Sequence, residues 1–381
     1  MAIKDGAKPK ILFYVQHLLG IGHLARASRV AAALQNDGFS VTIVTGGLPV
    51  RGFPPSQLDH VALPAVTSAS EAFSGLIDAD GNVIDDAFKE RRRELLIETL
   101  HERRPDIVVI EAFPFGRRQV RFELLPLLEA VAGMNPRPKL VTSVRDLLQE
   151  RVKPGRNEET VELLNAHFDL VMVHGDPKFA RLEDTFPLAG TIKPPIGYTG
   201  LVAPPPPAPP GETFQVLISA GGGAAGADLV KAAIEAADLL PNVQDWALIT
   251  GPNLPQFAYD MAAAKAPPGL KLFRFREDFP SLLAGTELSV SQAGYNTVCD
   301  VLRAGCRSLL VPFSAGGETE QTTRAERLER LGLTTMLPEH GLTGRQLAEA
   351  IAEALARPKP PAAALDLDGA NGAARLLRML L

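Results

Sequence analysis

The chain has few cysteines and tryptophans and no excess of basic residues. Its 381 residues include 2 cysteines and 1 tryptophan, and its net charge is −5. Cys299 and Cys306 lie close together in the sequence, so we expect no disulfide framework and a reducing compartment. A surface that binds nucleic acid needs a basic excess, so nucleic acid is not expected as a partner.

Long apolar segments are also missing. No run approaches the ~20 residues of a membrane-spanning helix, and residues 1–10 are polar, without the apolar core of a signal peptide. We therefore expect a cytoplasmic protein without a transmembrane segment. Contact with a membrane surface stays open, because residues 89–104 carry five arginines. Interleaved glutamates favour a solvated helix there instead. The sequence gives no indication of the oligomeric state.

Strand and helix patterns alternate along the chain, which favours an α/β fold with parallel sheets. A chain of 381 residues, 46% of them hydrophobic, is long enough for two domains. Residues 203–211 read APPPPAPPG. Prolines remove backbone donors, so this segment is predicted to be a polyproline linker outside the sheets. The predicted domains are residues 1–202 and 212–369.

The apolar runs predict five strands in each half of the chain. In the first half they are 10–16, 41–45, 107–111, 139–144 and 170–174. In the second half they are 214–219, 246–250, 271–274, 288–291 and 309–312. The clearest helix patterns are 23–36, 85–103, 118–132, 297–304 and 373–381.

Residues 288–325 contain the most specific pattern. The strand 288–291 leads into Gln292 and Gly294, a helix follows, and Gly305 ends it. Gly294 is predicted to let the backbone turn tightly after the strand. The positive N-terminal end of the following helix suits a phosphate. Asp300, about one turn inside this helix, is in position to reach a ribose hydroxyl.

This stretch resembles the nucleotide-sugar signature of GT-B glycosyltransferases, in particular MurG-type enzymes and UDP-glycosyltransferases. Their box has His-x-Gly-Trp-Asn-Ser, then an acid, a Gly five residues on and a Pro seven further. Here residues 292–297 read QAGYNT, followed at the same spacings by Asp300, Gly305 and Pro312. The box ends Asp-Gln-x-x-Asn-Ala, and residues 320–325 read EQTTRA. Gln292 replaces a phosphate-contacting His, so the identity of the donor is not carried over.

The resemblance implies a role for each matched position. Asp300 is expected to bind the ribose, and Glu320 and Gln321 the sugar hydroxyls. The diphosphate is expected at the loop and helix start, formed by Gln292, Gly294, Tyr295, Asn296 and Thr297. The alternative is an ordinary strand–Gly–helix unit without a ligand, in which the carboxylate of Asp300 only complements the positive N-terminal end of the helix.

Residues 17–26, HLLGIGHLAR, connect the first predicted strand to the first helix. Gly20 and Gly22 allow a tight turn, and His23 begins the helix at the strand ends, where open α/β sheets bind ligands. The segment resembles the Gly-His loop of GT-B enzymes, whose His is a base or acceptor contact. A neutral imidazole can take a proton from a hydroxyl. His17 is a rival base, Arg26 a possible phosphate or carboxylate clamp, and simple helix capping by His23 is the alternative.

Two further features complete the candidate site. Gly221, Gly222 and Gly223 follow a strand, so their backbone N–H groups suit a diphosphate. They resemble the Ser-x-Gly-Gly turn of MurG-like second domains. Glu111 ends a buried strand, where a carboxylate needs a partner. By resemblance it orients His23, and a salt bridge to Arg117 or Arg118 is the alternative.

The fold class implied is α/β of GT-B type, two Rossmann-like domains facing across a cleft, with the helix 370–381 packing back on the first domain. The activity implied is inverting transfer of a hexose-type sugar from a nucleoside-diphosphate sugar, with UDP-sugar favoured, to an unknown acceptor hydroxyl. No metal and no cofactor are expected beyond this co-substrate, because no cluster of His, Cys, Asp or Glu has metal-ligand spacing.

Two alternative functions stay open. One is a nucleotide-sugar hydrolase of similar fold, whose opening Gly-His-x-x-Arg matches residues 22–26. The other is a non-catalytic nucleotide-sugar-binding subunit.

Overall fold

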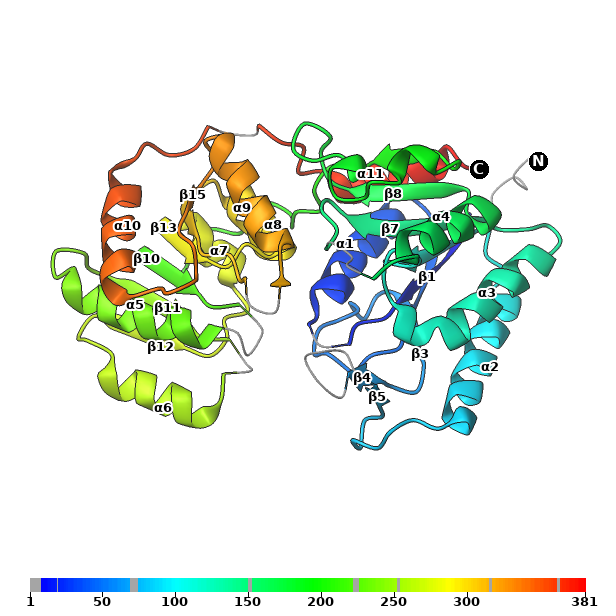
Figure 1. Cartoon of the computed structure of the whole chain (residues 1–381), viewed down its shortest axis with the longest axis horizontal. Coiled ribbons are helices and arrows are strands. Elements are labelled where there is room, and N and C mark those ends of the chain that lie inside the picture. Colours follow the sequence, from blue (N-terminus) through cyan, green and yellow to red (C-terminus); the bar gives the residue numbers. More distant parts are fainter. Residues whose placement is uncertain are drawn as a thin grey trace. The chain divides into compact units, whose positions relative to one another are not determined.

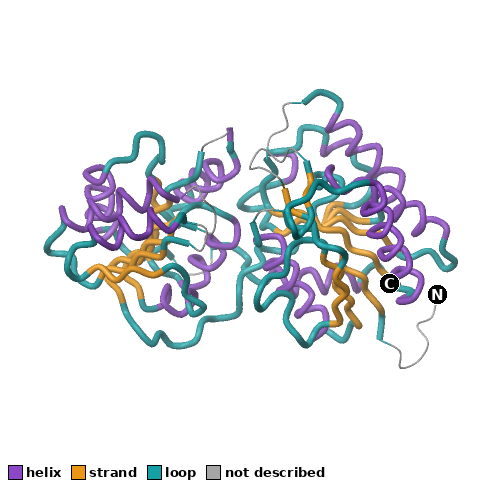
Figure 2. The backbone as a smooth tube through the Cα atoms, turned by 90° about the horizontal axis from the view of Figure 1, so that it is seen from below, coloured by secondary structure: helices purple, strands orange, loops and turns teal. Residues whose placement is uncertain are grey.

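The computed structural model describes residues 8–18, 20–68, 75–149, 153–221, 226–251, 254–314, 317–361 and 364–381. The chain divides into two compact units, Met1–Val202 with Asp368–Leu381, and Ala203–Leu367. Each unit has a layer of parallel strands with helices on both sides (Figures 1 and 2). The predicted fold class, α/β with two Rossmann-like domains, is confirmed. The predicted proline linker at 203–211 has no helix or strand and belongs to the second unit.

In the described residues the first unit has a seven-stranded sheet with the order β3-β2-β1-β6-β7-β8-β9, parallel throughout. Its strands are β1 (Lys10–Val15), β2 (Ser40–Thr45), β3 (Asp59–Ala62), β6 (Ile107–Glu111), β7 (Lys139–Arg145), β8 (Leu170–His174) and β9 (Ile196–Tyr198). A separate antiparallel pair is formed by β4 (Thr67–Ser68) and β5 (Leu76–Ile77). The central strands β1 and β6 are almost completely buried, as apolar strands covered on both faces must be.

Successive side chains along these strands point to opposite faces of the sheet, so they contact two different layers of helices. Leu12, Val108 and Val171 pack in one core with α2 (Asp86–Arg103), α3 (Arg121–Gly133) and α4 (Arg156–His167). The other face carries α1 (Gly22–Asn36) and α11 (Gly369–Arg378), which pack against each other (Figure 1). Glu111, Ser143 and His174 alternate with these core residues, so their side chains point to the α1 face. Three short 3-10 turns, Arg118–Val120, Leu182–Asp184 and Ala189–Thr191, complete the unit.

The second unit has a six-stranded sheet in the described residues, ordered β12-β11-β10-β13-β14-β15 and also parallel. Its strands are β10 (Phe214–Ser219), β11 (Trp246–Ile249), β12 (Leu270–Phe273), β13 (Thr286–Ser291), β14 (Arg307–Leu310) and β15 (Thr335–Met336). One core joins the sheet to α5 (Ala227–Leu239), α6 (Gln256–Lys265) and α10 (Gly344–Ala356). A second core joins it to α7 (Phe279–Ala284) and α8 (Tyr295–Ala304), and α9 (Glu320–Arg330) follows β14.

All ten predicted strands are present, each with bounds within two residues of the prediction. The strands missed are short: 59–62, 67–68, 76–77, 196–198 and 335–336. None of them is mainly buried, so they lack the long apolar run that marks a central strand. No helix in the described ranges is long and apolar enough to cross a membrane.

Candidate functional site

In the first unit, the candidate residues gather at the carboxyl ends of β1, β6, β7 and β8. All these strands are parallel, so their ends share one edge of the sheet. The loop after β1 leads directly into α1, of which His23 is the second residue. No side chain caps this helix start, since Ile21 at the N-cap position offers no acceptor. His23 therefore caps nothing here, and its ring instead faces the end of β6.

His23 and Glu111 form the central pair. Nδ1 of His23 lies 2.9 Å from Oε1 of Glu111, whose side chain is completely buried. The His23 side chain is 21% exposed, so the pair reaches the surface through the imidazole alone. In the described part of the chain, Nε2 of His23 has no hydrogen-bond partner. The predicted proximity of His23 and Glu111 is thus present, while their catalytic roles stay a prediction.

Arg26 is not placed to bind a phosphate or carboxylate group of a ligand, the role predicted as possible for it. Its side chain is 2% exposed and forms a salt bridge with Oε1 of Glu111, one turn below His23. A buried carboxylate needs such a partner, and a buried guanidinium needs the carboxylate equally. The sequence also left open a salt bridge of Glu111 with Arg118. This alternative is wrong, because Arg118 pairs with Glu159.

These neighbours set the protonation states of the pair. Burial alone would raise the pKa of Glu111, but Arg26 and the hydrogen bond from His23 outweigh it, so this pKa lies well below its usual range. Burial, with the positive charge of Arg117, lowers the pKa of His23 to about 3. At neutral pH His23 is therefore a neutral imidazole facing a carboxylate. Since the carboxylate carries no proton, Nδ1 is the donor and Nε2 holds the lone pair.

A chain of buried polar side chains extends behind Glu111, and the sequence pattern did not predict it. Ser143 Oγ lies 2.5 Å from Oε2 of Glu111 and 2.9 Å from Nε2 of His174. Nδ1 of His174 lies 3.0 Å from Oγ1 of Thr199, which follows β9. Burial, aided by the charge of Arg26, lowers the pKa of His174 to about 3. The available signal was a polar residue at or near the carboxyl end of each neighbouring strand, on the same side as Glu111.

The other candidate residues of the first unit are less well placed than His23 to act on a substrate. His17 is 5% exposed, and its Nε2 lies 2.9 Å from the carbonyl oxygen of Leu48. Burial lowers its pKa. An imidazole enclosed in this way cannot reach an acceptor, so His17 is a poor rival to His23. Gly20 lies in the exposed loop, and Gly22 is the first residue of α1.

In the second unit, two strand-end loops meet. Strands β10 and β13 are neighbours, with Ser219 opposite Ser291, so the loops that follow them start side by side. Gly221 has a φ of 80°, and a Cβ there would lie 2.6 Å from Oε1 of Gln292. Nε2 of Gln292 is buried without a hydrogen-bond partner among the described residues. Its N–H groups are available to an acceptor such as phosphate oxygen. Gly222 and Gly223 lie outside the described residues.

The helix after β13 differs in detail from the prediction. It begins at Tyr295 rather than Thr297, so Tyr295, Asn296 and Thr297 form its first turn. First-turn N–H groups have no intrahelical acceptor, which suits an anion. Gly294 has φ −63° and ψ 146°, a conformation open to any residue, so the turn after β13 does not use the conformational freedom of glycine. Asp300 is partly exposed on the second turn.

The predicted sugar-binding acid is engaged within the protein. Glu320, 3% exposed at the start of α9, pairs with Arg324, the two side chains lying 2.6 Å apart. Arg324 also donates to the carbonyl oxygen of Ala293, 3.0 Å away. Tyr295 is 4% exposed, so its ring is not open to a ligand. Gln321 is partly exposed, and its Oε1 accepts from the backbone N–H of Phe313.

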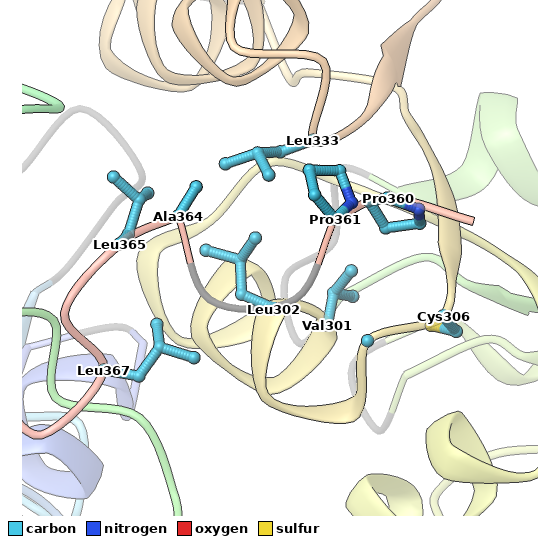
Figure 3. Close-up of a pocket in the computed structure, with 10 residues that line it drawn as sticks. Val301, Leu302, Cys306, Leu333, Pro360, Pro361, Ala364, Leu365 and Leu367 are labelled. Atoms are coloured by element: carbon cyan, nitrogen blue, oxygen red, sulfur yellow. The ribbon is translucent and has the colours of Figure 1, made fainter. Parts of the chain in front are cut away.

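An apolar pocket lies elsewhere in this unit (Figure 3). Its walls include Val301 and Leu302 of α8, Leu333, and Pro360 and Pro361. It has no charged side chain and none of the predicted donor residues, so it is not the candidate site. Within the described ranges no group of three or more His, Cys, Asp or Glu is placed to hold a metal ion.

Part of the chain matches a known protein family. Residues 217–376 match the Glycosyltransferase family 28 C-terminal domain. Over 140 residues the chain is 31% identical to UDP-N-acetylglucosamine--N-acetylmuramyl-(pentapeptide) pyrophosphoryl-undecaprenol N-acetylglucosamine transferase of Exiguobacterium sp., covering 35% of this chain and 37% of that one. The enzyme of the same name from Exiguobacterium sibiricum is 30% identical over 178 residues, 45% and 47% of the two chains. The matches thus span less than half the length of these curated relatives.

Solved structures match over almost the whole chain. The calicheamicin glycosyltransferase CalG4 superposes with a TM-score of 0.62 at 19% identity, covering 98% of this chain and 97% of the other. MurG of Acinetobacter baumannii gives a TM-score of 0.61 at 16% identity, covering 97% and 100%. At such identities the likeness establishes the fold. The chain has the GT-B fold of MurG-like and UDP-glycosyltransferase-like proteins, and its second unit matches the family 28 C-terminal domain.

Proposed function

We propose that this chain is a glycosyltransferase that moves a sugar from a nucleoside-diphosphate sugar to an acceptor hydroxyl, with inversion at the anomeric carbon. The observation that carries the proposal is the His23–Glu111 pair, a neutral imidazole with its Nδ1–H on a buried carboxylate and its Nε2 unoccupied. Nε2 of such an imidazole is suited to accept the proton of the attacking acceptor hydroxyl, while Glu111 stabilises the imidazolium that results.

The donor is assigned to the second unit. Gly221, the amide of Gln292 and the first turn of α8 supply N–H groups for a diphosphate, which leaves as a stabilised anion and needs no general acid. Asp300 is assigned to the ribose, and Gln321 to the sugar. Catalysis is proposed to need no metal and no cofactor, because these N–H groups and the dipole of α8 supply the positive potential. The match to family 28 in this unit supports the assignment.

The donor is proposed to be a UDP-sugar. The relatives named above use UDP-N-acetylglucosamine according to their names, so this compound is the first to test. The same names include a pyrophosphoryl-undecaprenol acceptor. A soluble analogue of such a lipid-linked sugar is therefore the first acceptor to test, and contact with a membrane surface belongs to the same proposal.

A hydrolase with the Gly-His-x-x-Arg opening is the second candidate, because residues 22–26 match it. One assay separates the possibilities: UDP release from UDP-N-acetylglucosamine is followed with and without acceptor, in the parent and in His23→Ala. Release that needs the acceptor and is lost in His23→Ala supports the transferase. Release without acceptor favours the hydrolase. Donor binding without turnover under any acceptor favours a non-catalytic binding subunit.

A further inference from the structure

The polar chain behind Glu111 is buried along its whole length. Ser143 and His174 are 0% exposed and Thr199 is 2% exposed. Its three links, Glu111 to Ser143, Ser143 to His174 and His174 to Thr199, measure 2.5, 2.9 and 3.0 Å. The two oxygens of Glu111 thus have different partners. Oε1 receives His23 and Arg26, and Oε2 receives Ser143.

The direction of each hydrogen bond follows from counting protons. The ionised carboxylate of Glu111 can only accept, so Ser143 gives its single hydroxyl proton to Oε2. Ser143 Oγ must then accept from His174, which places a proton on Nε2 of that imidazole. Neutral His174 has no second proton for Nδ1, so this link needs the hydroxyl proton of Thr199, for which the carbonyl oxygen of Gly200, 2.7 Å away, is the competing acceptor. One arrangement satisfies all three links while Glu111 is ionised.

We propose that Ser143 and His174 are positioning residues for His23: they hold Oε2 of Glu111 in place, so that Oε1 stays aligned with Nδ1 of His23 and Nε2 keeps its lone pair. His174 acts by forcing the Ser143 proton toward Glu111. Ser143 acts by preventing the carboxylate from turning about its last bond, where both oxygens would otherwise be available to Arg26. Neither residue touches a substrate in this account.

The charged groups around the carboxylate do not duplicate this function. From α1 it is faced by Arg26 and His23, from the loop after β6 by Arg117, and from β8 by His174. Arg26 keeps Glu111 ionised, but it shares Oε1 with His23 and so leaves the orientation of Oε2 undetermined. Ser143 is the partner of Oε2 in the described residues.

The test uses the full chain with histidines labelled by ¹⁵N, and NMR reads the tautomer of each imidazole. In the parent, His23 is expected to carry its proton on Nδ1. Ser143→Ala and His174→Leu remove the two links, so the Nε2–H tautomer of His23 is expected to appear. Ser143→Thr and His174→Gln keep a donor at the same point and should preserve the parent tautomer. Thr142→Ala is the matched control, since the hydroxyl of this buried neighbour on β7 has no hydrogen-bond partner among the residues described.

Retention of the Nδ1–H tautomer in both Ser143→Ala and His174→Leu overturns the proposal. If either strand variant does not fold, Thr199→Val tests the chain one step further away, because it is isosteric; a mixture of His23 tautomers supports the proposal, and an unchanged one overturns it.

The kinetic consequence rests on the proposed function, whereas the tautomer measurement needs no substrate and stands without it. If the chain is a glycosyltransferase, kcat of Ser143→Ala should fall on the order of 10²-fold, the typical loss when a reacting group is misplaced. The KM for the donor should stay constant. A tautomer change in a protein without any transferase activity would contradict the proposed function and leave the positioning of His23 intact. A tautomer change with kcat as in the parent would contradict the link to catalysis.

Discussion

Oε1 of Glu111 is shared by two residues of α1, with Nδ1 of His23 2.9 Å away and the guanidinium of Arg26 in a salt bridge one turn further on. The sharing separates two properties of the pair. Arg26 lowers the pKa of the carboxylate and so keeps it anionic at neutral pH, and His23 receives its orientation from that anion. Each property can be removed by a different substitution.

Replacing His23 by Ala should reduce turnover of a nucleotide sugar by ~10²–10⁴-fold, the usual contribution of a general base. Donor affinity should stay at the parent value, because the residues assigned to the donor belong to the other unit. Steady-state kinetics beside calorimetric titration with UDP measures both quantities. His60→Ala serves as control, since His60 lies in the same unit, is hydrogen-bonded to Thr45 and is not part of the candidate site. Parent-like turnover in His23→Ala would remove His23 from the mechanism.

Glu111→Gln should destabilise the protein by about 3–5 kcal/mol, because it removes the buried carboxylate that pairs with the buried guanidinium of Arg26. The matched control is Glu159→Gln, which removes a carboxylate from Arg118 and Arg121 at the surface. There the loss should be about 0–1 kcal/mol, as for exposed pairs. Urea unfolding of both variants measures the difference, and equal losses would show that burial of the Arg26 pair contributes nothing.

Stability should decrease as the pH falls below about 6.5. The pKa values of His23 and His174 are lowered to about 3 in the folded protein. Between pH 6.5 and 3 these two histidines are therefore protonated in the unfolded chain and neutral in the folded one. Their contribution to stability is complete above the unfolded pKa and lost toward pH 3. The lowered pKa of Glu111 acts in the same direction below about pH 4.3. His174→Gln should flatten the slope of unfolding free energy between pH 6.5 and 4.

The same values predict the pH profile of turnover. Because His23 is neutral throughout this range, kcat/KM should show no acid limb near pH 6.5. An acid limb at an ordinary histidine pKa that persists in His17→Gln would mean that His23 titrates normally.

Gly221→Ala should weaken donor binding as well as stability. The φ of 80° costs a non-glycine residue about 1–2 kcal/mol, and the new Cβ would displace Gln292. Gly332→Ala separates the two effects, because Gly332 has a φ of 70° with nothing within 4 Å of the added Cβ. Both variants should lose stability by thermal denaturation, and only Gly221→Ala should lose affinity for UDP. Equal affinities in the two variants would exclude Gln292 from the diphosphate site.

Asp300→Ala should weaken binding of a nucleotide sugar by about 1.5–3 kcal/mol, the range for loss of a hydrogen bond to a charged group. Asp260→Ala, on the exposed face of α6 in the same unit, should leave the affinity unchanged. Isothermal titration with UDP and with the free uracil base locates the loss. If Asp300→Ala weakens both ligands equally, the ribose assignment is wrong.

Much of the fold could be predicted because its information is local. Apolar runs such as residues 107–111 and 214–219 predicted central strands with their final bounds, since these strands are buried on both faces. Edge strands such as β3 and β15 could not be predicted, because β3 is mainly exposed and β15 is a partly buried strand of two residues. The glycine and polar residues after β1, β10 and β13 were readable as strand-end loops, and parallel strands bring such loops to one edge.

The residue pattern alone places His23, Glu111, Gly221 and Gln292 at strand ends. Which of them come into contact depends on the order of the strands in the folded chain. Glu111 contacts His23 and Arg26 because β6 lies next to β1, and it contacts Ser143 because β7 lies on its other side. These partners are 88, 85 and 32 positions from Glu111. Local periodicity carries no information on strand order, so Arg26 was predicted as a ligand contact and Ser143 and His174 were missed.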